Sequence, residues 1–285
     1  MGRWQRQWYL PAVDLKDRVA IVTGASSGIG LALARMLIAE GASVAMVARG
    51  VDRLERVCAE LGPKAIAFAL DVGDLARLAN LPGEVVAKLG RLDVVVNNAG
   101  VHYRGDMLRH EADKLATMFM VNLVAPVVLT RVAADVMPTG SVVVNVASLA
   151  GKLGVPGSAV YSGTKAGLRF WAMAAAGDLE GRGIRIANVN PGPVDTGFFD
   201  DDFDNVSNLT FSQPMVTADA VALRVMEAIH SEKTGLDLDI PVGSGKLATL
   251  GYLMPSIGRM LRPMLERKGA AAKARYAERR GAASK

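Results

Sequence analysis

Residues 18–30 read Arg-Val-Ala-Ile-Val-Thr-Gly-Ala-Ser-Ser-Gly-Ile-Gly. Residues 18–23 form a short apolar run that ends in glycines, which is typical of a buried parallel strand. From Ile29 to Glu40 apolar residues recur at helical spacing, and Gly41 follows as a stop signal. The segment therefore predicts a strand, a tight turn and a helix in succession.

The same alternation continues along the chain without a composition break or an internal repeat. Further strands are predicted at 43–48, 64–70, 92–96, 141–146, 183–189 and 235–240, and further helices at 52–61, 75–89, 111–136, 159–180 and 217–230. Right-handed crossovers wind such a pattern into one parallel sheet with helices on both faces. We therefore expect an α/β fold with a doubly wound parallel sheet in three layers.

Composition excludes several classes of protein. The chain has 285 residues, 51% hydrophobic and 21% charged, which suits a packed domain rather than a disordered or fibrous chain. A single cysteine, Cys58, excludes a disulfide framework, and His102, His110 and His230 show no metal-ligand spacing. We expect no metal site and expect these histidines at the surface or in loops.

The termini show no sign of export or of a spanning helix. Residues 1–17 lack the apolar core and small-residue cleavage site of an export signal. No uninterrupted apolar run reaches the about 18 to 20 residues needed to cross a bilayer. A cytoplasmic, single-domain protein is the expectation.

Candidate ligand-binding residues follow the predicted strands, at the carboxyl ends where parallel sheets bind ligands. They comprise Gly24, Ser26, Ser27, Gly28, Ile29 and Gly30 after the first strand, Arg49 after the second, Asp71 and Val72 after the third, and Asn98 within Asn97-Asn-Ala-Gly100 after the fourth.

Each of these positions has a cofactor-binding interpretation and a structural alternative. The glycine turn can bind a pyrophosphate through helix N–H groups, although its Gly-x-x-x-Gly-x-Gly spacing would also suit a plain tight turn. Arg49 can pair with the 2′-phosphate of NADP(H), or it can be a solvated arginine. Asp71 can contact an adenine or cap the next turn. The paired asparagines can lie along a flat cofactor or only shape a loop.

Tyr161 and Lys165 lie four residues apart on a predicted helix and so share a face. A neighbouring ammonium favours the phenolate and lowers the pKa of a tyrosine, which would make Tyr161 a general acid/base near neutrality. Tyr-x-x-x-Lys alone is a weak pattern. Ser148 strengthens it, because this hydroxyl follows the fifth predicted strand and can reach the same rim of the sheet.

Together these motifs resemble the short-chain dehydrogenase/reductase superfamily over residues 16–242. The resemblance rests on Thr23-Gly-Ala-Ser-Ser-Gly-Ile-Gly30, Asn97-Asn-Ala-Gly100, Asn122, Ser148, Tyr161-x-x-x-Lys165 and Pro191-Gly-Pro-Val-Asp-Thr196, in family order. It implies a Rossmann-type fold and hydride transfer between a nicotinamide cofactor and a carbonyl or alcohol carbon. It also implies a homodimer or homotetramer.

The resemblance assigns roles to single residues. Tyr161 would be the acid/base, Lys165 would hold the nicotinamide ribose, and Ser148 would orient the substrate oxygen. Asn122 would bend its helix and hold a water in the proton relay. The backbone near Val194 and the hydroxyl of Thr196 would bind the nicotinamide carboxamide.

Cofactor choice has one departure from the family pattern. Arg49 matches the family arginine that implies NADP(H), but some NADP-preferring members also carry a basic residue in the glycine loop, where this chain has Ser26. NADP(H) is therefore the preferred cofactor, and NAD(H) stays open.

Residues 197–214 contain Phe198, Phe199 and Phe203 beside an acidic cluster. This pattern indicates either a mobile lid over an apolar substrate or a disordered polar loop.

The C-terminal residues carry the positive charge of the chain. Residues 245–285 hold ten Lys/Arg and two Glu, a net charge of +8, against −3 for the rest (23 basic, 26 acidic). The mildly acidic body does not suggest nucleic acid as a partner. Apolar residues recur there at helical spacing: Leu250, Leu253, Ile257, Met260, Leu261, Met264 and Leu265.

Three roles for this extension stay open: binding an anionic membrane surface, packing on another subunit, or packing over the substrate pocket. Pro255 and Pro263 are expected to interrupt any single straight helix, and residues 270–285 are expected to fray.

We therefore expect an N-terminal arm at 1–17, a Rossmann-type catalytic domain at 18–244 and a basic amphipathic extension at 245–285. The expected function is NADP(H)-dependent oxidation and reduction of a small-molecule ketone or secondary alcohol, apolar in character. The alternatives are a membrane-peripheral enzyme acting on lipid-like substrates and a non-catalytic nucleotide-binding regulatory protein.

Overall fold

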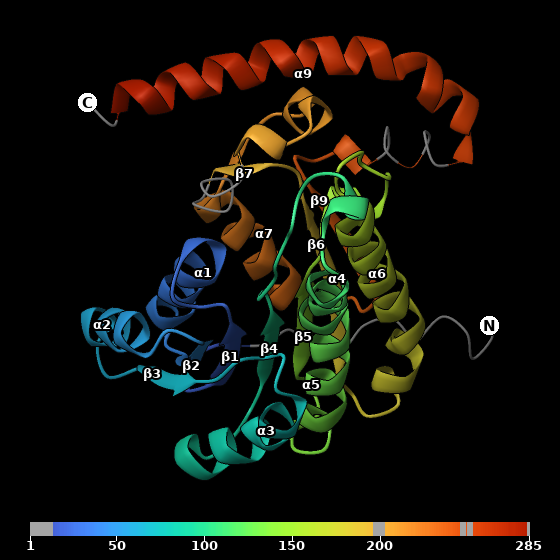
Figure 1. Ribbon diagram of the computed structural model, residues 1–285. Coiled ribbons are helices and arrows are strands. Elements are labelled where there is room, and N and C mark those ends of the chain that lie inside the picture. The colour runs from blue at the N-terminus through green and yellow to red at the C-terminus, as the bar shows by residue number, and fades with distance from the viewer. Residues whose placement is uncertain (1–13, 196–202, 246–248, 250–252, 284–285) are drawn as a thin grey trace, which may run out of the picture.

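A parallel sheet forms the centre of the molecule (Figure 1). The computed structural model describes residues 14–195, 203–245, 249 and 253–283. Within them the sheet has the order β3-β2-β1-β4-β5-β6-β9, and every neighbouring pair is parallel. Its strands are β1 (Val19–Thr23), β2 (Ser43–Ala48), β3 (Ala65–Ala69), β4 (Val94–Asn97), β5 (Val142–Val146), β6 (Arg185–Pro191) and β9 (Leu236–Ile240). The strand order reverses between β1 and β4, which places the expected ligand crevice at their carboxyl ends.

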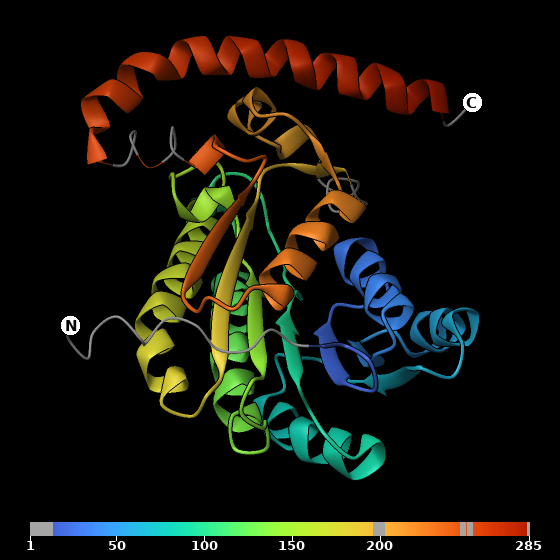
Figure 2. The same ribbon diagram turned by 180° about the vertical axis from the view of Figure 1, so that it is seen from behind.

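Helices cover both faces of the sheet, as Figures 1 and 2 show from opposite sides. One face carries α1 (Gly28–Ala39), α2 (Val51–Leu61) and α7 (Ala218–His230). The other carries α3 (Leu75–Leu89), α4 (Ala112–Phe119), α5 (Ala125–Ala133) and α6 (Ala159–Glu180). This confirms the predicted three-layered, doubly wound α/β fold.

Two apolar cores lie on the two faces of the sheet, and alternate residues of each strand enter them. In β1, Ala20 and Val22 join the core under α1 and α7, whereas Val19 and Ile21 join the core under α3 and α5. Burial on both faces explains why the strands are continuous apolar runs rather than alternating ones.

The helix predicted at 111–136 is interrupted. A π-helix, Met120–Val124, separates α4 from α5 and contains the fully buried Asn122. Such bulges are frequent at functional sites. Among the described residues, Ala112–Ala133 is also long and apolar enough to span a bilayer by length and composition. In the fold these helices pack against α3, α6 and the sheet.

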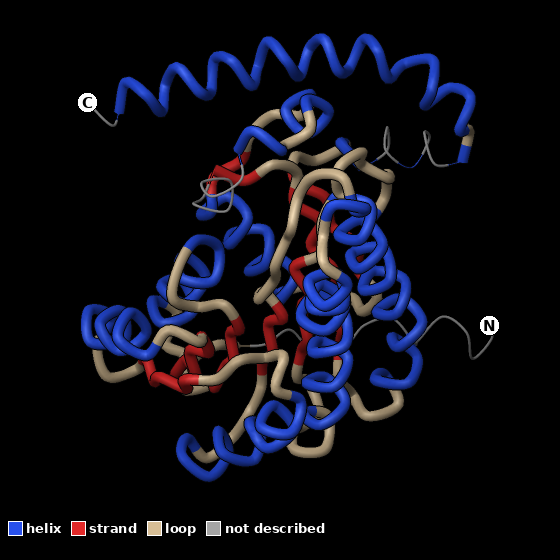
Figure 3. Tube along the Cα trace, viewed as in Figure 1, coloured by secondary structure: helices blue, strands red, loops and turns tan. Residues whose placement is uncertain are grey.

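Short elements near the carboxyl edge of the sheet were not predicted. They are the two-residue strands β7 (Val194–Asp195) and β8 (Val216–Thr217) and the 3-10 turns η2 (Met107–Arg109), η4 (Leu149–Gly151) and η6 (Asn208–Ser212). Figure 3 shows how these turns and loops gather at one end of the red strands.

Helix α9 (Pro255–Ala283) lies across that end of the molecule (Figure 1). Pro255 and Pro263 were expected to interrupt any single straight helix: the helix begins at Pro255 and is not straight, but it is not broken at Pro263. Residues 270–283 were expected to fray and are helical, and residues 284–285 lie outside the described residues. Pro263 lies inside one helix that continues to Ala283, and the helix bends near its N-terminal end. Packing against η6 stabilises the remainder, although proline removes one backbone hydrogen bond.

Candidate active site

The turn between β1 and α1 has the geometry of a backbone cradle. Gly24 and Gly28 have φ of +66° and +51°, which favour glycine. A side chain at Gly30 would collide with the carbonyl oxygen of Gly24 and lie 2.7 Å from the Asn98 amide nitrogen. Ser26, Ser27 and Ile29 line the same cavity. The helix N-terminus is therefore open to an anion without side-chain obstruction.

Thr23 and Asn98 brace this turn. The Thr23 hydroxyl accepts hydrogen bonds from the backbone nitrogens of Asn98 and Ala99 at 2.9 and 3.0 Å. The Asn98 side chain donates to the carbonyl oxygens of Thr23 and Gly24 at 2.8 and 3.3 Å. The paired-asparagine segment thus shapes the loop, and Asn98 also lines the cavity; contact between this segment and a cofactor stays a prediction.

Arg49 directly follows β2, its side chain is 71% exposed, and its guanidinium lies 3.8 Å from the Asp71 carboxylate. Asp71 also accepts a hydrogen bond from the Gly73 nitrogen at 2.9 Å, so it caps a turn as the structural alternative proposed. Both residues line the cavity together with Val72.

Arg53 is a basic residue that the sequence did not point to. It lies in the first turn of α2, four residues after Arg49, lines the cavity, and donates from Nε to the Ser26 carbonyl oxygen at 3.1 Å. The glycine loop itself carries no basic residue, because it has Ser26, but the guanidinium of Arg53 lies beside that loop. Its position at the start of the helix predicted at 52–61, close in the chain to Arg49, was the signal that could have revealed it.

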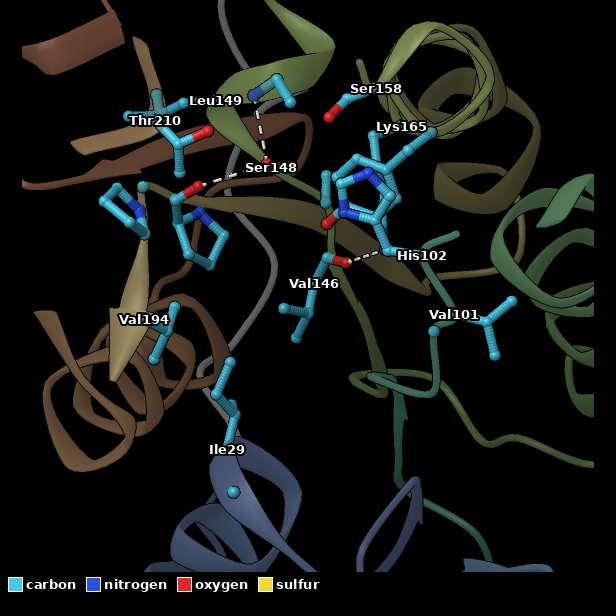
Figure 4. A pocket seen from close by; sticks show the side chains of 18 of the residues that line it. Ile29, Val101, His102, Val146, Ser148, Leu149, Ser158, Lys165, Val194 and Thr210 are labelled. Carbon is cyan, nitrogen blue, oxygen red and sulfur yellow. Dashed lines mark hydrogen bonds between the residues drawn. The ribbon is translucent and has the colours of Figure 1, made fainter. Parts of the chain in front are cut away.

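Ser148, Tyr161 and Lys165 line the cavity together at the carboxyl ends of β5 and β6. Figure 4 shows Ser148, His102 and Lys165 around this part of the cavity. Ser148 ends β5 as the cap of η4; its Oγ accepts from the Ala150 nitrogen at 3.1 Å and donates to the Pro191 carbonyl at 3.4 Å. Tyr161 is hydrogen-bonded to Ser148. The Lys165 ammonium donates to the Val146 carbonyl at 2.8 Å and lies 5.9 Å from the Tyr161 ring centre.

The pKa of Tyr161 is shifted in the direction opposite to the one expected from its spacing to Lys165. Burial raises the pKa of Tyr161, and the hydrogen bond to Ser148 and the charge of Arg104 only partly oppose it. Burial also lowers the pKa of Lys165 to about 8. The prediction that Lys165 sets a lowered pKa for Tyr161 is therefore wrong here, because the ammonium is directed at a backbone carbonyl.

His102 and Arg104 are two further residues beside the tyrosine. The His102 ring stacks on Tyr161 with centroids 4.0 Å apart and an interplanar angle of 11°. Burial, reinforced by the charges of Arg104, Lys165 and His110, lowers the pKa of His102 to about 3, so the ring is neutral. The expectation of a loop histidine was right, but the residue is part of the site rather than of the surface. Arg104 is 5% exposed and lines the cavity.

Asn122 connects three segments from inside the π-helix. Its Oδ1 accepts from the Val101 nitrogen at 2.8 Å, and its Nδ2 donates to the Val101 carbonyl and to Thr164 Oγ1 at 2.9 and 3.2 Å. The loop after β4 is thereby fixed to α6, which carries Tyr161. A role for Asn122 in a proton relay stays a prediction.

One cavity of about 1190 Å³ runs from the glycine turn to α9 and is lined by the arginines, by Asn98, His102, Ser148, Tyr161 and Lys165; Thr23, Gly30 and Asn122 support its walls from behind without lining it. This volume exceeds the about 300–1,000 Å³ of common ligand pockets, so a dinucleotide and a second molecule can be accommodated together. Val194 lines it, whereas Thr196, Phe198 and Phe199 lie outside the described residues. Among residues 14–195, 203–245 and 253–283, no group of three or more His, Cys, Asp or Glu could hold a metal.

Comparison with known proteins gives consistent matches. The family model described as "short chain dehydrogenase" matches residues 18–207. The ketoacyl reductase HetN of a Nostoc species is 36% identical over 226 residues, which cover 77% of this chain and 78% of that protein. Meso-2,3-butanediol dehydrogenase of Serratia marcescens is 36% identical over 183 residues, 63% of this chain and 72% of that one.

Solved structures resemble the fold closely. A short chain dehydrogenase from Burkholderia cenocepacia, in complex with NADP, has a TM-score of 0.74 and 32% identity, covering 82% of this chain and 100% of its own. BdcA in complex with NADPH has a TM-score of 0.70 and 31% identity, covering 79% of this chain and 93% of its own.

Proposed function

The chain belongs to the short-chain dehydrogenase family, and we propose that it is an NADP(H)-dependent member acting on an apolar ketone or secondary alcohol. The observation that carries the proposal is the meeting of Ser148, Tyr161 and Lys165 in a cavity continuous with the glycine turn. Membership in a family of oxidoreductases favours an enzyme over the alternative of a non-catalytic nucleotide-binding regulatory protein.

The residues fit a phosphorylated dinucleotide. The cradle at Gly24 and Gly30 leaves room for a pyrophosphate at the N-terminus of α1. Arg49 and Arg53 supply positive charge beside it, and the NADP and NADPH complexes of similar structures support the same choice. Asp71 competes for Arg49 across 3.8 Å, so a 2′-phosphate would have to displace this weak, exposed pair.

Bound NADPH would supply the hydride, and the protein would supply orientation and the proton. Ser148 and Tyr161 can both hydrogen-bond a carbonyl oxygen between them, where negative charge grows as the carbon is reduced. A raised pKa keeps Tyr161 protonated near neutrality, so it can donate its proton to that oxygen. The Arg104 charge and the Ser148 hydrogen bond would stabilise the phenolate that remains.

The substrate end of the cavity is largely apolar. Its walls include Leu149, Leu153, Val155, Val206 and Leu209. Such a lining favours a substrate with apolar groups next to the reacting carbon.

The proposal is tested with Tyr161→Phe. The variant should lose about 10²- to 10⁴-fold in kcat while NADPH binding stays nearly unchanged, because only the transferable proton is removed. Turnover is followed by loss of NADPH absorbance over a carbonyl panel, with NADH in parallel. Tyr103→Phe, in the loop after β4, is the matched control. Full activity of Tyr161→Phe would refute the assignment.

Exposed apolar residues support a homo-oligomer. Phe119 on α4 and Phe170 and Met173 on α6 are 44%, 56% and 45% exposed on helices that contact each other. A second copy covering this face would bury them. Light scattering after size exclusion should give a dimer or tetramer, and Phe170→Ser with Met173→Ser should shift it toward the monomer.

A second candidate function is a membrane-peripheral enzyme acting on lipid-like substrates. Leu253, Met260 and Met264 are 69%, 72% and 60% exposed in a basic segment. Cosedimentation with phosphatidylglycerol vesicles tests it, comparing the full chain with Met260→Ser/Met264→Ser. Unchanged partitioning would reject the membrane role and leave the cytoplasmic location predicted from the sequence.

A further inference from the structure

Helix α9 presents one face to the body of the protein. Its inward residues recur at intervals of three and four and comprise Leu261, Leu265, Gly269, Ala272 and Tyr276. Met260 and Met264, which directly precede Leu261 and Leu265 in the chain, are instead 72% and 60% exposed. The apolar residues that appeared as one pattern in the sequence thus divide into an inner and an outer set.

The C-terminal half of this inner face is an anchor. Gly269 packs so closely that a side chain would collide with the Asn208 carbonyl of η6. Tyr276 is 6% exposed, and its ring lies 5.9 Å from Phe203 and 5.7 Å from Phe211. Lys273 donates to the carbonyl oxygens of Val206 and Asp204 at 2.8 and 3.1 Å. The helix is therefore held against residues 203–212.

One anchor contact reaches the cofactor side of the cavity. The Tyr276 hydroxyl donates to the Asp195 carboxylate at 2.6 Å. Asp195 belongs to β7 and directly follows Val194, and both residues line the cavity. The position of α9 is thus fixed relative to the strand that follows the end of β6.

The N-terminal half of the inner face lines the cavity itself. Leu261 and Leu265 are cavity residues, and so is Arg262, whose guanidinium is paired with the Glu266 carboxylate at 2.7 Å. Leu153, in the loop after η4, and Leu209, in η6, line the same cavity. Apolar side chains from α9 thus face a cavity that also contains Ser148 and Tyr161.

We propose that α9 is the far wall of the substrate site, and that Leu261 and Leu265 contact the part of the substrate remote from the reacting carbon. The inference rests on the proposed function and names its substrate class: a ketone or secondary alcohol carrying an extended apolar portion. The wall lies after residues 18–207, which the family model matches.

A homologous series of methyl ketones tests the wall. Dissociation constants are measured by calorimetry, with and without NADP⁺, so that the readout does not depend on turnover. For the full chain, affinity should rise about three- to fourfold per added methylene until the wall is reached. Leu261→Ser/Leu265→Ser should flatten this dependence while the affinity for the shortest ketone stays the same.

The control is Met260→Ser/Met264→Ser, which makes the same change on the exposed side of the same turns. It should keep the full chain-length dependence. The inference is overturned if the Leu double variant keeps the dependence, if the control loses it equally, or if the unaltered protein shows none. NADPH binding and the loss of turnover in Tyr161→Phe report separately on the proposed function, so the two failures are distinguishable.

Discussion

At the scale of single residues, the charge of Arg104 opposes the effect of burial on Tyr161. Oxidation of an alcohol requires the phenolate, so its rate should increase as pH rises through the pKa of Tyr161. Arg104→Met removes the cation, raises that pKa further, and should move the pH profile of kcat/KM for oxidation upward by about one unit.

Two variants separate this charge effect from a loss of packing. Arg104→Lys should restore the original profile, and Arg109→Met, at an exposed position in the same loop, should leave it unchanged. A profile for Arg104→Met that falls in amplitude without moving would assign Arg104 a structural role only.

Arg49 and Arg53 carry the second prediction at this scale. Arg49→Asp should weaken NADPH binding by about ten- to a hundredfold, because a charge-assisted hydrogen bond to phosphate is replaced by repulsion, and should affect NADH far less. Arg53→Ala should act in the same direction. Arg56→Ala, exposed on the same helix, should not. Equal losses for both cofactors, measured by fluorescence titration, would mean that neither arginine meets the phosphate.

The sequence predicted the residues whose chemistry is local in the chain. Ser148, Tyr161 and Lys165 follow from strand ends and helical spacing, and they do converge. His102, Arg104 and Arg53 were missed, because their roles depend on contacts between segments: a ring stacked on Tyr161, a charge near it, and a bond to the Ser26 carbonyl.

At the scale of elements, the turn η4 is fixed by a buried ionic cluster. Lys152 closes η4, and its ammonium lies 2.8 Å from Asp237 and 2.6 Å from Asp239 on β9. Asp237 also accepts from Arg169 and Asn190, at 2.7 Å each. Since Ser148 caps the other end of η4, this cluster positions the serine relative to β6 and β9.

Lys152→Met should therefore affect both stability and turnover. Removing one partner of a buried pair leaves charges uncompensated, so the free energy of unfolding should fall by about 3–5 kcal/mol. The kcat should fall with little change in NADPH affinity, because η4 carries Ser148 and not the cofactor turn. Urea unfolding and steady-state kinetics measure these effects. Lys233→Met, an exposed control, should change neither; an unchanged kcat in a weakened Lys152→Met protein would remove the positioning role.

Elements with a strong periodicity were predicted to within a residue or two, and α3 and α6 have the expected bounds. The family resemblance implied a bend at Asn122, but periodicity alone did not predict the π-helix Met120–Val124, because Asn122 contacts with Val101 and Thr164 stabilise it and no local pattern encodes them. The two-residue strands β7 and β8 are too short to show a period.

At the scale of the whole molecule, α9 links the substrate end of the cavity to the segment around η6. Helical order over residues 270–283 was not predicted, because the alanine- and charge-rich composition is a local signal, whereas Tyr276, Gly269 and Lys273 form tertiary contacts that outweigh it. The division into arm, domain and extension stays a prediction.

Gly269→Ala tests how much of the molecule depends on this helix. The added methyl group collides with the Asn208 carbonyl, so docking of α9 should weaken by roughly 1–3 kcal/mol. Hydrogen exchange should then accelerate along α9 and η6 and stay slow in β1, β4 and β5, which lie in the centre of the sheet. Ala270→Ser is the control on the exposed side. Uniformly faster exchange in sheet and helix would instead mean that α9 is part of a single cooperative unit.

The N-terminal half of α9, proposed as the far wall of the substrate site, lies after the residues that the family model matches. This separation affects how substrate selectivity can evolve. With α9 as the proposed wall of the substrate site, substitution or recombination within 255–265 should reshape that site without changing the glycine turn or Tyr161. Chimaeras that keep the anchor at Gly269–Tyr276 and exchange the helical turns before it should therefore change substrate selectivity while the rest of the protein stays the same.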